Sequence, residues 1–147
     1  MSLKNRITED MKDAMRARAV ARLSTIRLLL AAIKQKEVDE RVDVGDADIV
    51  AIIERMIKQR RESIAQFEAG KRPDLVANER AEIEVLQGYM PQALSDTEVD
   101  ALIIAAVAQA GGGMAAMGKV MAALRPQFAG RADMGTVSAK VKARLST

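Results

Sequence analysis

DADIVAIIERMIKQRRESIAQFEAG, residues 46–70, is the stretch that decides the fold, because its apolar residues recur at the spacing of one helix face. Asp46 is a plausible helix N-cap, and Gly70 is a natural helix end. A long helix with one apolar face needs other helices to cover that face. The residues expected to form the face are Ile49, Ile53, Met56, Ile57, Ile64 and Phe67, and Arg60 falls among them.

Three further helices are predicted around this one. Apolar residues at intervals of three and four predict a helix over residues 3–18 and a second over residues 20–37. A proline suited to a first helical turn begins a fourth helix over residues 73–90. The stripe expected to be buried in the second helix is Val20, Leu23, Ile26, Leu30 and Ile33.

A new structural unit is expected to begin with the capping box at residues 95–98. The glycines at 111–113 end its first helix, and Asp133 is positioned to cap its last. The predicted fold is therefore all-α. About four helices form an N-terminal domain at residues 1–91, and a small three-helix bundle forms a C-terminal tail domain at residues 95–147.

The composition of the 147 residues supplies a core but few catalytic groups. Hydrophobic residues make up 49% of the chain, whereas histidine and cysteine are both absent. The commonest general bases, the commonest nucleophiles and the usual transition-metal ligands are therefore missing. We expect no catalytic residues, no metal and no cofactor, and no enzyme activity of the chain on its own.

The location expected from the sequence is cytoplasmic. The absence of cysteine excludes disulfide bonds, and the first residues lead into a charged helical pattern without an apolar leader segment. No apolar stretch approaches the length of a membrane span, so no membrane partner is expected.

Arg60 needs an explanation, because an arginine on an apolar face must be paired, reach solvent along its stem or serve a function. Glu79 and Glu82 are placed on the apolar face of the next predicted helix. An ion pair between helices, from Arg60 to Glu79 or Glu82, would account for all three residues. We favour this structural interpretation over a functional one.

The last part of the chain is strongly basic. Residues 101–147 contain six Lys and Arg but one acidic residue, Asp133. Such a surface is typical of phosphate contact, although a solvated face is an equally simple interpretation. With few aromatic residues to stack on bases, a folded RNA suits the chain better than a single strand. The candidate nucleic-acid-binding residues are Lys119, Arg125, Arg131, Lys140, Lys142 and Arg144.

Several motifs resemble the GatB/YqeY family. They are RLSTIRLLLAAIK at 22–34, MIKQRRESIAQF at 56–67, EIEVLQGYMP at 82–91, MGKVM at 117–121 and GRAD at 130–133. The chain is similar to free-standing YqeY-like proteins and to the C-terminal helical and tail region of the B subunit of the aspartyl/glutamyl-tRNA amidotransferase.

This resemblance implies a two-part all-helical fold and a tRNA-binding accessory module that serves translation by docking. The family's label of carbon–nitrogen ligase with glutamine as amide donor would describe the multisubunit enzyme, whose catalytic domain this chain lacks.

Two alternatives remain at this point. The chain could be a protein-interaction module that binds an amidotransferase or an aminoacyl-tRNA synthetase through its N-terminal helices, without RNA contact. It could also be an amidotransferase component that is active only in a complex. tRNA is the expected partner in the first interpretation, and no DNA partner is expected.

Overall fold

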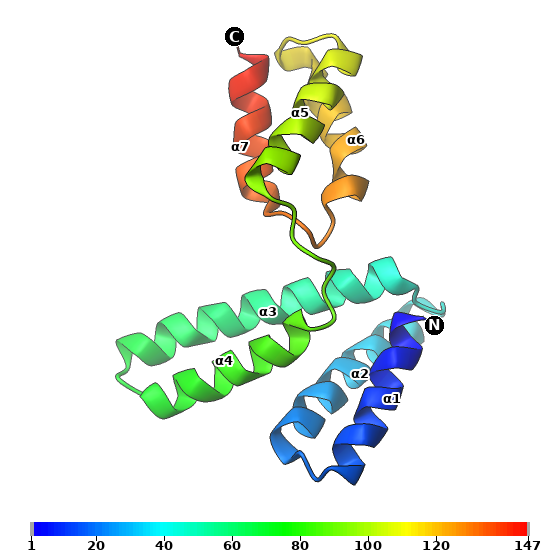
Figure 1. Ribbon diagram of the computed structural model, residues 1–147, viewed down its shortest axis with the longest axis vertical. Helices are drawn as coiled ribbons and strands as arrows, with labels where there is room; N and C mark the ends of the chain where they lie inside the picture. The colour runs from blue at the N-terminus through cyan, green and yellow to red at the C-terminus, as the bar shows by residue number, and fades with distance from the viewer. Residues whose placement is uncertain (1, 147) are drawn as a thin grey trace. The chain divides into compact units, whose positions relative to one another are not determined.

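The computed structural model describes residues 2–146, and within that range all regular structure is helical, with no strand (Figure 1). The prediction of an all-α fold is confirmed. The contacts divide the chain into two compact units, Met1–Met90 and Pro91–Thr147, called unit 1 and unit 2 below. The helices are α1 (Leu3–Arg16), α2 (Val20–Glu40), α3 (Asp46–Ala69), α4 (Pro73–Gln87), α5 (Asp96–Ala110), the short 3₁₀ helix η1 (Met114–Ala116), α6 (Met117–Phe128) and α7 (Met134–Leu145).

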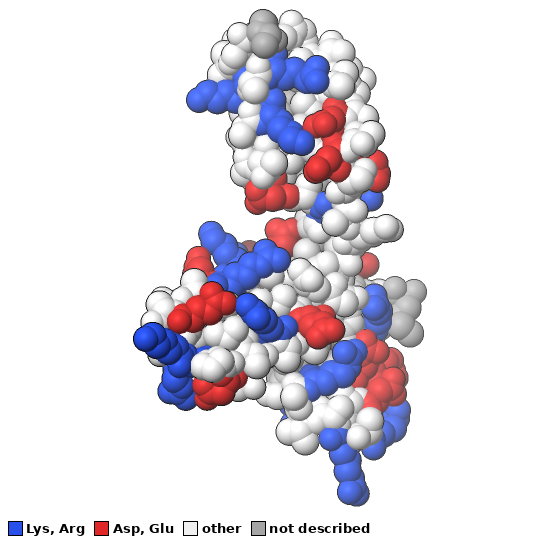
Figure 2. Space-filling view, turned by 60° about the vertical axis from the view of Figure 1, so that its left-hand side comes forward, with Lys and Arg blue, Asp and Glu red and all other residues white. Residues whose placement is uncertain are grey.

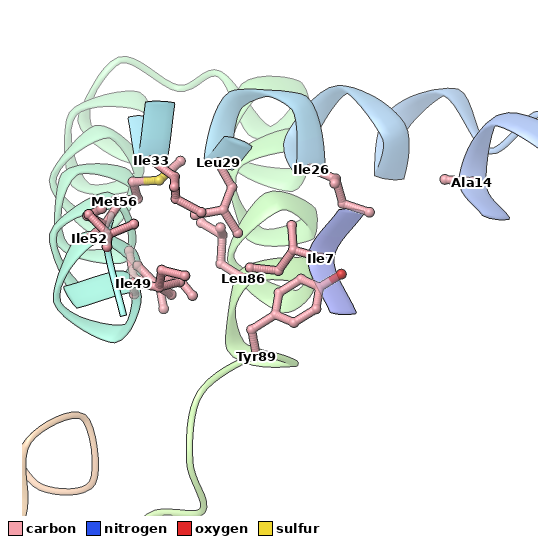
Figure 3. Packing of buried hydrophobic residues seen from close by; sticks show 13 residues of the cluster. Ile7, Ala14, Ile26, Leu29, Ile33, Ile49, Ile52, Met56, Leu86 and Tyr89 are labelled. Carbon is pink, nitrogen blue, oxygen red and sulfur yellow. The ribbon is translucent and has the colours of Figure 1, made fainter. Parts of the chain in front are cut away.

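Unit 1 contains two helix pairs, α1 with α2 and α3 with α4, and the helices of each pair lie side by side (Figure 1). The first half of α3 supplies the core as predicted, because Ile49, Ile53, Met56 and Ile57 are buried. Figure 3 shows side chains of α3 and α2 meeting Leu86 of α4. Ile64 and Phe67 are only half-buried, since they lie toward the α3–α4 turn, which projects beyond α1 and α2 (Figure 1). The expected core face of α3 therefore holds for its first half.

The buried face of α2 differs from the predicted stripe. Thr25, Ile26, Leu29 and Ile33 are buried, whereas the side chain of Val20 is 76% exposed. Residues 28–33 are all apolar, so the pattern fits several helix faces about equally well and cannot select one. Packing against α1, α3 and α4 selects the face that carries Leu29.

Asp46 does not cap α3, contrary to the prediction. It is the first helical residue, and its Oδ1 accepts a hydrogen bond of 3.0 Å from the Leu3 amide at the start of α1. Gly45 is the N-cap, and the Gly45 amide donates a hydrogen bond of 3.2 Å to the Asp48 carboxylate. The two aspartates thus satisfy backbone donors at the starts of two different helices.

Polar side chains join distant parts of unit 1. Lys4 Nζ lies 2.8 Å from Glu37 Oε2, and this hydrogen bond, aided by one from the Val44 amide, lowers the pKa of Glu37. The Tyr89 hydroxyl donates to Asp10 Oδ2 at 2.6 Å. Burial, with this hydrogen bond next in size, raises the pKa of Tyr89 well above its usual value. These contacts attach α1 to the end of α2 and to the residues that follow α4.

Unit 2 encloses a second core of apolar residues. α5 begins with the expected capping box, in which Ser95 Oγ accepts from the Glu98 amide at 3.2 Å. Gly111 ends α5 with φ +92°, a left-handed conformation that favours glycine. Asp133 caps α7 as predicted by accepting from the Thr136 amide at 3.0 Å. The fully buried side chains of this core include Phe128, Leu124, Val120, Val137 and Val141.

Candidate binding surfaces

The six cationic residues predicted to contact nucleic acid all lie in unit 2, but they are not equivalent. Lys140 of α7 forms an ion pair of 3.0 Å with Asp100 of α5. Arg131, in the turn before α7, donates through Nε to the Gln92 carbonyl at 3.0 Å. The other four occupy exposed positions, Lys119 and Arg125 on α6 and Lys142 and Arg144 on α7. Contact of these four with an anionic ligand stays a prediction.

The basic surface expected from the linear count is interrupted by acids from earlier in the chain. Asp96 and Glu98 lie in the first turn of α5, where their negative charges interact favourably with the positive end of the helix dipole. Asp100 follows them and reaches Lys140, 40 residues away in sequence. Figure 2 shows acidic and basic side chains close together on the face of unit 2 that it presents. These acids precede residue 101, so the charge count for residues 101–147 does not include them.

Arg60 pairs with a glutamate of the neighbouring helix. Its Nε lies 2.8 Å from Glu82 Oε2, and its Nη1 donates to the Met56 carbonyl at 3.2 Å. The side chains of Arg60 and Glu82 are 13% and 30% exposed, so the pair is largely shielded from water. Glu79 is half-buried one turn earlier on α4. This geometry matches a structural contact between α3 and α4 and leaves the guanidinium of Arg60 engaged within the protein.

The described side chains form no candidate metal centre. Within residues 2–146, no group of three or more histidine, cysteine, aspartate or glutamate side chains could hold a metal ion. No single helix in this range combines the length and apolar character of a membrane crossing. Only α5 together with the η1–α6 segment meets those criteria, as a pair bent by 106°.

An exposed apolar surface on α2 was missed by the sequence reasoning. It is the outer face of α2, defined here by Val20, Leu23, Ser24, Arg27 and Leu28, which line a hollow of about 430 Å³. Val20 is 76% exposed and Leu28 is 47% exposed. The sequence did contain a signal for this surface, because α2 has more apolar residues than one buried face can hold.

Comparison with known proteins identifies a family that this chain matches. A sequence model of the family described as Yqey-like protein matches residues 4–145. The chain is also similar to proteins named altered inheritance of mitochondria protein 41, mitochondrial. The relative from Pyrenophora tritici-repentis is 33% identical over 140 residues, which cover 93% of this chain and 77% of the relative.

Two yeast relatives with the same name match a shorter part of the chain. The Kluyveromyces lactis protein is 39% identical over 102 residues, covering 67% of this chain and 55% of the relative. The Lachancea thermotolerans protein is 37% identical over 100 residues, covering 66% and 54%. The chain thus spans about half the length of these two yeast relatives.

These comparisons correct the predicted function. The prediction of a tRNA-binding module related to amide transfer is wrong, because the relatives are named for the inheritance of mitochondria. The alternative, docking to an amidotransferase or a synthetase, is wrong for the same reason. The physical basis was also weak. The supposed RNA surface is interrupted by Asp100, and Arg131 contacts the backbone of its own unit.

The predicted cytoplasmic location is contradicted by the same names, which describe the relatives as mitochondrial. The absence of cysteine carried that prediction. It excludes disulfide bonds but does not distinguish between compartments that lack them.

Proposed function

This chain belongs to the Yqey-like protein family, and we propose that it is a protein-binding helical module that performs the same molecular task as the matching part of its mitochondrial relatives. The observation that carries the proposal is the outer face of α2, where large apolar side chains face solvent. The chain contains no histidine and no cysteine, so binding suits its residues better than catalysis does.

The outer face of α2 has the properties of an anchor point. Val20 and Leu28 lie two helical turns apart, and the half-buried Leu23 lies between them in sequence. Complete burial of one such side chain against a partner contributes roughly 1.5–3 kcal/mol. Helix-in-groove recognition uses apolar anchors of this kind at helical spacing.

The match to relatives gives the proposal its biological test. In Kluyveromyces lactis, the region of the relative that matches this chain is replaced by this chain, and mitochondrial inheritance is scored in dividing cells. We expect the chimera to restore inheritance to a strain that lacks the relative. A stably expressed chimera that does not restore inheritance would contradict the shared task.

The outer face of α2 is tested in the same chimera. The double variant Val20→Gln and Leu28→Gln removes the apolar anchors while keeping the backbone helical, and we expect inheritance to be lost. The matched control is Ile104→Gln on α5, whose side chain is 46% exposed, and this variant should function normally. Equal behaviour of the two variants would show that the face of α2 is not the binding surface.

A further inference from the structure

The charges around the outer face of α2 are all of one sign over a long segment. Residues 14–36 contain six Lys and Arg and no Asp or Glu. Acids from outside this segment act on some of them: Asp13 lies 3.0 Å from Arg16, Asp10 lies 3.8 Å from Arg22, and Glu40 lies 3.6 Å from Lys36. Glu37 is close enough to Lys34 to interact with it electrostatically, although its hydrogen bonds go to Lys4 and the Val44 amide. The segment therefore presents a positive potential that flanking residues reduce only in part.

Two cations lie along the same side of the helix as the apolar anchors. Arg27 lines the hollow together with Val20 and Leu28, and its side chain is exposed. Lys34 follows Arg27 by seven residues, so it lies on the same side two turns further along. From Val20 to Lys34 this side measures about 21 Å, at 1.5 Å per residue. That length accommodates about four turns of a partner helix.

We infer that the outer face of α2 receives an amphipathic helix of a protein partner, with leucine-like residues on its inner side and Asp or Glu along its flanks. This inference rests on the proposed function and adds the chemistry of the partner. The apolar side of the partner would fill the hollow between Val20 and Leu28, and its carboxylates would face Arg27 and Lys34.

A nucleic acid fits this surface less well than an acidic helix does. Phosphates would satisfy Arg27 and Lys34, but a phosphate backbone offers nothing to cover the apolar side chains of Val20, Leu23 and Leu28. An uncharged apolar helix would cover them and leave the cations facing apolar surface, where their desolvation is unfavourable. An acidic amphipathic helix satisfies both features together.

The experiment selects the partner's charge without assuming its sequence. A display library of helical peptides has leucine fixed at i, i+4, i+7 and i+11, and its flanking positions are randomised among Glu, Lys and Ser. The library is selected on the full-length chain, on the double variant Arg27→Glu and Lys34→Glu, and on a control with equal charge change, Lys58→Glu and Arg61→Glu in α3. Circular dichroism checks that all three proteins are helical.

We expect Glu to be enriched over Lys on the unchanged chain and on the α3 control, and we expect the preference to reverse on the Arg27 and Lys34 variant. The best acidic peptide should bind that variant at least tenfold more weakly. Failure to select any binder, or a charge preference that Arg27 and Lys34 do not affect, would overturn the inference.

The two proposals fail in distinguishable ways. If inheritance depends on Val20 and Leu28 but no acidic preference is selected, the acidic helix is wrong and the protein-binding role stands. If acidic peptides bind at Arg27 and Lys34 but the chimera does not restore inheritance, the chemistry of the face is supported and the task shared with the relatives is wrong.

Discussion

Unit 1 and unit 2 are both helical, but different interactions position their helices. In unit 1, polar contacts join residues far apart in sequence, such as Lys4 with Glu37 at 2.8 Å and Tyr89 with Asp10 at 2.6 Å. In unit 2, many side-chain hydrogen bonds are local, including the caps of Ser95 and Asp133, while Lys140 with Asp100 is a long-range contact. The comparison indicates that apolar burial stabilises both units and that long-range polar contacts also position helices in both, through more residues in unit 1 than in unit 2. Four predictions test this difference, from the largest expected effect to the smallest.

Phe128→Ala should have the largest effect, because this side chain is fully buried in the core of unit 2. Loss of a buried aromatic ring costs roughly 3–5 kcal/mol of unfolding free energy. Hydrogen exchange should show lost protection in α5, α6 and α7, while α1 to α4 keep theirs. Equal loss in both units would show that they unfold together and would remove the basis for treating them separately.

Arg60→Ala should destabilise unit 1 by about 2 kcal/mol, less than the 3–5 kcal/mol expected for breaking a completely buried pair. The reason is that Glu82 loses its partner while it remains 30% exposed to water. Replacing both partners, as in Arg60→Met with Glu82→Leu, leaves no unpaired charge and should be close to neutral. Urea unfolding compares the two variants, and equal small effects from both would indicate that the pair contributes little.

Tyr89→Phe should reduce the unfolding free energy by about 1 kcal/mol, because the hydrogen bond to Asp10 is lost. It should also change the alkaline pH dependence. The pKa of Tyr89 is raised in the folded state, so the stability from its protonated form is complete below about pH 10 and declines at higher pH. The variant should show a shallower decline above pH 10, and an unchanged slope would contradict the assignment.

Asp133→Asn should have the smallest effect, because asparagine also caps helices well. Hydrogen bonds from the Thr136 hydroxyl and amide lower the pKa of Asp133. The ionised carboxylate therefore contributes stability above its unfolded pKa of about 3.9, and this contribution is lost as the pH falls. Thermal melts should differ slightly at pH 7 and converge near pH 2. A difference that persists at pH 2 would point to a cause other than charge.

The helical pattern of the chain was predictable because its caps are local. Ser95, Asp133 and Gly111 each act through a few neighbouring residues, so their roles follow from short stretches of sequence. The role of Asp46 was not predictable in this way, since its carboxylate receives a hydrogen bond from Leu3, 43 residues away. The face of α2 was unpredictable for a related reason, because tertiary packing selects Leu29 over its apolar neighbours.

The candidate surfaces were predicted less well than the helices. The pair of Arg60 with a glutamate of α4 follows from the helix periodicity of two segments, although periodicity did not distinguish Glu82 from Glu79. The role of Lys140 depends on Asp100, whose proximity comes from the packing of α5 against α7. Exposure of Val20 likewise depends on which side of α2 the other helices cover. Side-chain neighbours of this kind are properties of the tertiary structure.

The first residues of unit 2 are hydrogen-bonded to the turn between α6 and α7 of the same unit. The Leu94 amide donates to the Arg131 carbonyl at 2.8 Å, and Arg131 Nε donates to the Gln92 carbonyl at 3.0 Å. Cleavage of the chain between Met90 and Pro91 would therefore leave both hydrogen bonds within a single fragment. A protease site engineered at that peptide bond should release the last 57 residues as an intact three-helix body. If it does, unit 1 and unit 2 can each be tested separately in the yeast chimera.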